Sequence, residues 1–140
     1  MTHPLLGPVV ALALWTFVMW GWMYATRLPA VRRARMKLDP EALRGEQMAT
    51  LPARVRWKAD NYNHLFEQPT VFYAVAIVAH LVDPRDRASL ILAWIYVGLR
   101  VVHSVWQATR NVIEVRFTLF ALSSLVLLAF TVRLGLQLVQ

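Results

Sequence analysis

The chain has 140 residues, of which 58% are hydrophobic and 16% charged, with a formal net charge of +7 and no cysteine. A soluble domain carries about a quarter charged residues, so the composition argues against a soluble fold. The lack of cysteine excludes disulfides, cysteine metal ligands and a protein-supplied thiol. The basic residues flank apolar blocks and form no separate basic domain, which argues against nucleic-acid binding.

Four apolar blocks are long enough to cross a hydrocarbon core, which requires about 20 helical residues. In chain order, the predicted spans are approximately 5–26, 62–82, 88–106 and 117–139. The sequence therefore predicts one domain over residues 1–140, an all-α integral membrane protein that forms a bundle of four transmembrane helices. Arg133 lies near the end of the last block, where its side chain can snorkel to the interface.

The connections between the spans differ in charge. The first, residues 27–58, contains nine basic residues against three acids, and the third, 107–116, adds Arg110 and Arg116. The 83–87 turn has only two basic residues. With four spans, the first and third connections share one side of the membrane. The positive-inside rule places that side in the cytoplasm and both termini outside it.

The first connection also carries a helix-start signal. Asp39-Pro40-Glu41 combines a capping residue, a proline suited to the first helical position and an acid in the first turn. We expect a short helix over the following residues, 42–48, lying near the anionic leaflet.

The second predicted span begins with polar groups that lipid cannot solvate. On one continuous helix over 60–73, at about 100° per residue, they share less than half of the circumference. Ionisable groups at membrane depth usually face a bundle interior or a wet cavity. Arg100 and His103 share one face of the third span, so we expect one of them to pair with Glu67. The polar residues of the second span are Asp60, Asn61, Asn63, His64, Glu67 and Gln68.

Two interpretations of this polar face remain open from the residues alone. The side chains either form interhelical hydrogen bonds or line a ligand-binding cavity, with Gln68 included in either case. His64 and His103 lie on different spans without a third ligand at a suitable spacing, so we expect no metal site.

These features together resemble the MAPEG family, the membrane-associated proteins of eicosanoid and glutathione metabolism. The resemblance covers the whole chain, including its four spans and its long basic first connection. Members are trimers of four-helix protomers, so the resemblance implies a homotrimer, here of a bacterial type in the inner membrane. The residues that carry the resemblance are Arg56, Asn61, Asn63, His64, Glu67, Gln68, Pro69, Arg100, His103, Arg116 and Phe117.

The resemblance also implies a function. In glutathione-using members the tripeptide sits between adjacent protomers near the cytoplasmic face. By motif position, glutathione would contact Arg56, Asn61 or Asn63, and Glu67, with Arg116 as a candidate thiolate stabiliser. The implied activity is a transferase or peroxidase that acts on a lipophilic small molecule, with membrane lipid around the protein. Two alternatives are a non-catalytic protein that uses the cavity for a lipid or a partner helix, and a small proton-coupled exporter with Glu67 as proton carrier.

Overall fold

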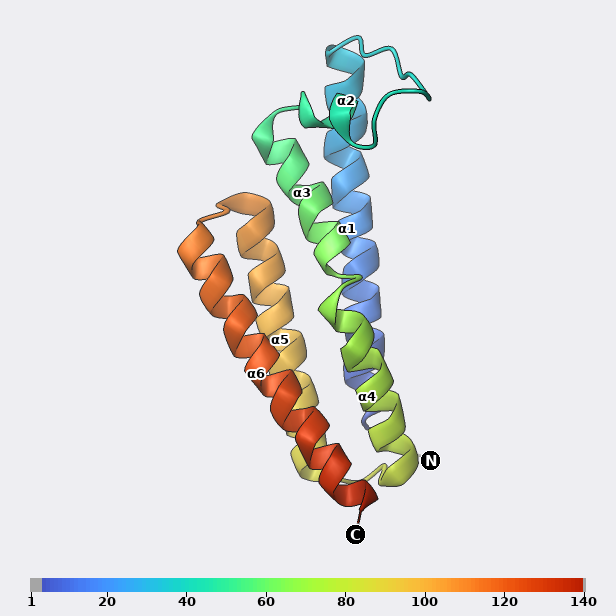
Figure 1. Cartoon of the computed structure of the whole chain (residues 1–140), viewed down its shortest axis with the longest axis vertical. Helices are drawn as coiled ribbons and strands as arrows, with labels where there is room; N and C mark the ends of the chain where they lie inside the picture. The colour runs from blue at the N-terminus through green and yellow to red at the C-terminus, as the bar shows by residue number, and fades with distance from the viewer. Residues whose placement is uncertain (1–3, 140) are drawn as a thin grey trace.

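The computed structural model describes residues 4–139, and the described chain contains helices and no strand. Figure 1 shows that α1 begins and α6 ends at the same end of a long bundle, whereas α2 lies at the opposite end. The elements in chain order are α1 (Leu6–Arg33), α2 (Glu46–Ala49), α3 (Ala53–His64), α4 (Gln68–Val82), α5 (Arg87–Thr109) and α6 (Ile113–Leu138).

Four helical segments have the length and apolar composition needed to cross a membrane, which confirms the predicted fold class. The helices are longer than the predicted spans. The first continues to Arg33 and the second begins at Ala53 rather than at residue 62. A hydropathy pattern identifies only the part of each helix that lies in hydrocarbon. The helices continue beyond that part because alanine and arginine favour a helical backbone. Both ends of the predicted 27–58 connection, residues 27–33 and 53–58, are therefore helical, in addition to α2 within it.

The second span is interrupted at residues 65–67, between α3 and α4 (Figure 1). Pro69 explains the position of the break, because it has no N–H to donate to the Leu65 carbonyl and its ring would clash with that group. Glu67 has a non-helical backbone, with φ −87° and ψ −101°. The prediction of one continuous helix over 60–73 is therefore wrong, and its polar residues do not form a single face.

The predicted helix start at residues 39–41 is also wrong. The Asp39 carboxylate accepts a hydrogen bond from the backbone N–H of Glu41 at 2.9 Å, which closes a local turn. The short helix begins only at α2, after Gly45, whose φ of 85° few other residues tolerate. An acid that bonds to the backbone two residues ahead favours a turn as readily as a helix cap.

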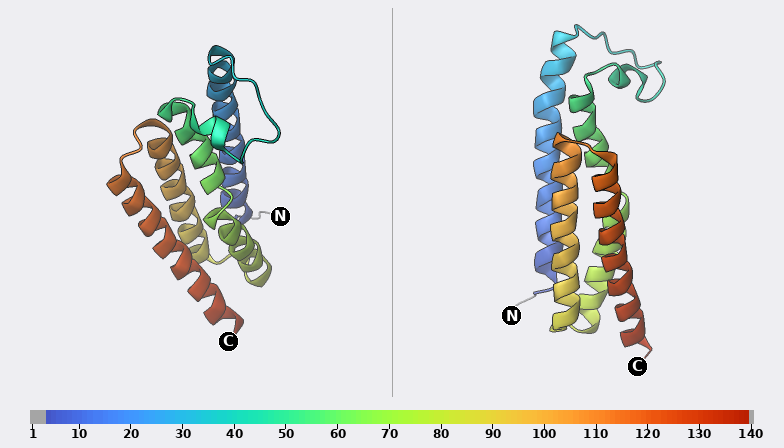
Figure 2. Two further views of the ribbon diagram at one scale, coloured as in Figure 1. Left: turned by 45° about the horizontal axis from the view of Figure 1, so that its top comes forward. Right: turned by 90° about the vertical axis from the view of Figure 1, so that its left-hand side faces the viewer.

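An aromatic stack lies at the centre of the bundle. Phe72 of α4 packs on Tyr96 of α5 with ring centroids 4.6 Å apart, and Phe130 of α6 lies 6.5 Å from Phe72. The outer surface is also apolar, with Phe17 70% and Leu81 77% exposed. Such a surface is unfavourable in water but is the normal exterior of a helix bundle in lipid. Figure 2 shows this elongated bundle from two further sides.

The side chain of Arg133 is held by an ion pair and does not extend freely toward the membrane interface. Its guanidinium donates two hydrogen bonds of 2.9 Å to the carboxylate of Asp86, which lies in the turn before α5. Gln137 and Ser89 donate to the same carboxylate at 2.9 and 2.6 Å. Asp86 therefore ties the start of α5 to the last turns of α6.

Candidate functional site

A pocket of about 480 Å³ lies beside the break in the second span, between α3, α5 and α6. Its volume is within the range of about 300–1,000 Å³ that is usual for small-molecule sites. Three helices and the non-helical link supply its walls, so only the folded chain assembles it. The residues that line it are His64, Glu67, His103, Ile113, Arg116, Phe117 and Phe120.

Glu67 is the carboxylate of this pocket. Its side chain is exposed and makes no hydrogen bond or ion pair with the described residues. The expected pairing with Arg100 or His103 is therefore wrong within one protomer. Because this carboxylate has no protein partner among the described residues, it is available to water or to a ligand cation in the pocket.

Arg100 is buried next to the pocket and has neutral partners. Its Nη2 donates to Oε1 of Gln68 at 2.6 Å, and its Nε donates to the Tyr96 hydroxyl at 3.0 Å. The guanidinium also lies over the ring of Phe120, 5.3 Å from its centroid. Gln68 donates in turn to the Ser124 hydroxyl at 2.7 Å. Gln68 and Arg100 therefore connect α4, α5 and α6 from inside the bundle and do not line the pocket.

The two predicted histidines meet at the pocket. His103 is 3% exposed, and its ring stacks on His64 with centroids 6.4 Å apart and planes at 19°. His103 also lies 6.5 Å from the ring of Phe120. This places two imidazoles, each able to donate a hydrogen bond, on the wall next to Glu67.

Arg116 supplies the cation of the pocket. Its Nη1 donates to the Asn111 side-chain oxygen at 2.5 Å, while its Nε is buried without a hydrogen-bond partner. Asn111 has φ 53°, a left-handed conformation that asparagine tolerates better than most residues. Asn111 thus orients the guanidinium, a role that the sequence reasoning missed. The sequence feature that could have indicated this role is an asparagine in the turn before the last helix.

The remaining predicted residues lie elsewhere. Arg56 and Asn63 line a second pocket of about 230 Å³ that also includes Arg27. Asn61 is 1% exposed and donates to the Ser104 hydroxyl at 2.5 Å, which ties α3 to α5. The structure therefore brings together four predicted site residues and places five outside their pocket. The four are His64, Glu67, His103 and Arg116.

The sequence model of the MAPEG family matches residues 5–136. The chain belongs to the MAPEG family. No curated protein and no solved structure matches it. The match extends from the start of α1 into the last turns of α6, so the fold described above is that of an integral membrane protein of this family.

Proposed function

We propose that this MAPEG protein binds glutathione at the pocket beside the helix break and uses it on lipophilic electrophiles. The observation that carries the proposal is the presence of two groups without partners in one pocket. These are the carboxylate of Glu67 and the buried Nε of Arg116. A ligand that carries charges of both signs would supply a partner to each of them.

The residues present suit such a ligand. Glutathione has two carboxylates, an ammonium and a thiol, so its site needs at least one acid and cationic donors. Glu67 would hold the ammonium, and Arg116 would hold a carboxylate or the thiolate. His64 and His103 add further donors. One protomer places a single guanidinium here, so we propose that a neighbouring protomer of a homotrimer supplies the second.

Bound glutathione would supply a thiol nucleophile. The guanidinium of Arg116 would favour the thiolate by stabilising its negative charge, and the hydrogen bond from Arg116 to Asn111 keeps that guanidinium oriented. Phe117 and Phe120 form an exposed aromatic side of the pocket, 69% and 38% accessible. An apolar electrophile could therefore enter from the bilayer.

The proposed orientation puts the pocket near the cytoplasmic face. The loop from 34 to 52 and the 110–112 turn lie at the same end of the bundle (Figure 1), and the last turn of α1 carries Arg32 and Arg33. By the positive-inside rule this end faces the cytoplasm, with both termini on the opposite side. For a protein of bacterial type, the membrane would be the inner membrane.

Thermal unfolding of the detergent-purified protein tests the binding step. We expect millimolar glutathione to raise the unfolding temperature, and Glu67→Gln and Arg116→Gln to lose this effect. Glu114→Gln and Arg110→Gln are matched controls because both side chains are exposed and neither lines the pocket. The proposal fails if glutathione does not stabilise the unmodified protein. Stabilisation without conjugation of a chromogenic electrophile would favour the non-catalytic alternative.

The broken span favours a second candidate, proton-coupled export. Discontinuous membrane helices often carry substrate and ion sites, and Glu67 lies in the break itself. Efflux from proteoliposomes driven by a proton gradient tests this function. Loss of efflux in Glu67→Gln would support it, whereas efflux that is insensitive to that change would remove it.

A further inference from the structure

The pocket beside the helix break contains two histidines whose ability to accept a proton the proposed binding contacts do not use. His103 comes from the inside of α5 and is 3% exposed, whereas His64 ends α3 and is half-buried. Neither ring nitrogen of His103 makes a hydrogen bond with another described residue, and neither is completely enclosed by the protein. Because His103 lines the pocket, these nitrogens are available to a ligand there.

The neighbours of His103 connect the two parts of the pocket. Its ring stacks on His64, with centroids 6.4 Å apart, and His64 precedes Glu67 by three residues. Its ring also lies 6.5 Å from the ring of Phe120, which belongs to the exposed aromatic side. His103 therefore shares the pocket with the proposed partner of the glutathione ammonium and contacts the side by which an electrophile would enter.

A thiol in this pocket needs a proton acceptor, because only the thiolate is the nucleophile. A thiol has an ordinary pKa of about 8.5 and an imidazole one of about 6.5, so a neutral imidazole can take the thiol proton at a modest cost. A glutamate carboxylate, with an ordinary pKa of about 4.3, is a much weaker base. A guanidinium stays protonated and cannot accept a proton. Among the ionisable side chains of the pocket, an imidazole therefore suits the thiol best.

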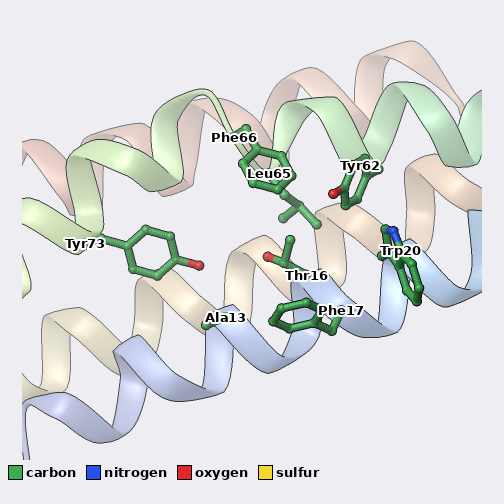
Figure 3. A pocket seen from close by; sticks show the side chains of 8 residues that line it. All are labelled: Ala13, Thr16, Phe17, Trp20, Tyr62, Leu65, Phe66 and Tyr73. Carbon is green, nitrogen blue, oxygen red and sulfur yellow. The ribbon is translucent and has the colours of Figure 1, made fainter.

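The apolar pocket between α1 and the second span lacks such a base. Its volume is about 210 Å³, and its lining residues include no histidine, acid, lysine or arginine. Figure 3 shows the hydroxyl groups of Tyr73 and Thr16 pointing toward one another across this space. A tyrosine hydroxyl has an ordinary pKa of about 10 and does not take a proton from a thiol at neutral pH. Thiol activation therefore fits the pocket beside the break and not this one.

The charged and titratable groups that face His103 come from every element around it. They are Arg100 on α5, His64 on α3, Glu67 in the link before α4 and Arg116 on α6. The two guanidinium groups oppose a positive charge on the ring of His103, whereas the carboxylate and a newly formed thiolate favour it. Proton transfer from sulfur to imidazole leaves the net charge of the pocket unchanged, and Arg116 stabilises the thiolate that results.

We propose that His103 is the general base of the conjugation reaction, an inference that rests on the proposed binding of glutathione. A ring nitrogen of His103 takes the proton of the thiol, and the sulfur forms a bond to the electrophilic carbon. When the electrophile is an aryl halide, the carbon–halogen bond breaks and the halide ion leaves with the bonding electrons. The imidazolium then gives its proton to water. His64, stacked on the ring, limits its rotation.

The pH dependence of turnover tests this role. Conjugation of glutathione to a chromogenic aryl halide is measured in detergent, together with thermal stabilisation by glutathione. We expect His103→Gln to keep the stabilisation and the KM for glutathione but to lose about 100-fold in kcat at neutral pH. The loss should shrink as the pH approaches the ordinary thiol pKa of about 8.5, where the thiol ionises without a base. His80→Gln, on α4 and outside the pocket, is the matched control.

This inference and the proposed function fail in different ways. If His103→Gln is stabilised by glutathione and keeps the kcat and the pH profile of the unmodified protein, His103 is not the base and only this inference is overturned. If glutathione does not stabilise even the unmodified protein, the proposed function itself is overturned, and the inference with it.

Two further measurements distinguish a base from a residue with a purely structural role. Free imidazole should restore part of the activity of His103→Ala, because it can enter the space that the ring leaves. In the unmodified protein with labelled histidine, the nitrogen chemical shifts should show that glutathione protonates one imidazole. S-methylglutathione, which has no thiol proton, should not. This measurement decides the result if the variants do not fold, and unchanged histidine signals with glutathione would overturn the inference.

Discussion

Nη2 of Arg100 donates to Oε1 of Gln68 at 2.6 Å, which joins α5 to the first residue of α4 immediately after the helix break. Gln68 can serve this cation because its amide nitrogen also has an acceptor, the Ser124 hydroxyl. A neutral amide thus accepts the hydrogen bond of the buried guanidinium. The carboxylate of Glu67, one residue earlier, therefore remains free to bind a ligand in the pocket.

Removal of this amide should destabilise the bundle. Gln68→Ala leaves the Nη2 of Arg100 buried without its acceptor, and we expect a loss of about 1.5–3 kcal/mol in the free energy of unfolding. Thermal or denaturant unfolding in detergent measures it. Asn63→Ala, at an exposed position without a side-chain hydrogen bond, is the control. Equal stability of the two variants would mean that Arg100 finds another partner.

The Asp86 cluster should make stability depend on pH. Hydrogen bonds from Arg133 and from Ser89 and Gln137 hold the pKa of Asp86 well below its usual range, against the opposing effect of burial. This contribution is fully present above the ordinary pKa of about 4 and is lost as the pH falls toward the lowered value. The unfolding temperature of the unmodified protein should therefore decline below about pH 4.

Asp86→Asn should reduce that decline and lower stability at neutral pH by about 1–2 kcal/mol. The loss is moderate because Arg133 is 41% exposed and solvent screens the pair. Unfolding curves collected from pH 3 to 7 measure both effects. Asp83→Asn, in the same turn but exposed, should keep the unmodified protein's profile. Parallel profiles for Asp86→Asn and the unmodified protein would contradict this account.

The break at residues 65–67 should depend on Pro69. Pro69→Ala restores an N–H that can donate to the Leu65 carbonyl and removes the ring that clashes with it. We expect slower amide hydrogen exchange over 65–68, by about tenfold, as the helix becomes more continuous. Pro29→Ala is the control, because Pro29 lies inside α1 without ending it. Unchanged exchange rates in Pro69→Ala would mean that tertiary packing, and not Pro69, causes the break.

Asn111 should affect ligand binding more than folding. Asn111→Gly keeps the left-handed backbone accessible but removes the oxygen that accepts from Arg116. We expect the glutathione concentration for half-maximal stabilisation to rise about three- to tenfold, since the guanidinium loses its orientation. The unfolding temperature without glutathione should stay nearly unchanged. Asn111→Ala, which cannot adopt this backbone cheaply, should lower that temperature as well.

The four membrane-length helices follow from the sequence alone. Each apolar block is long enough for the bilayer, and lipid requires a helical backbone wherever such a block crosses it. The ionisable residues of the candidate pocket could also be identified from the sequence. These are His64, Glu67, His103 and Arg116, which are polar groups within or next to apolar spans. Even the cause of the break could be seen in Pro69, although its effect on the helix was not anticipated.

Only the tertiary structure decided how these polar groups pair. Glu67 and Gln68 are adjacent in sequence, yet the break directs one into the pocket and the other to Arg100. Asp86 and Arg133 are 47 residues apart, and the hairpin of α5 and α6 brings them together. Whether a segment crosses the bilayer depends on how many apolar residues follow one another in the sequence. A hydrogen bond depends on distances of about 3 Å between particular atoms, which only the packed helices determine.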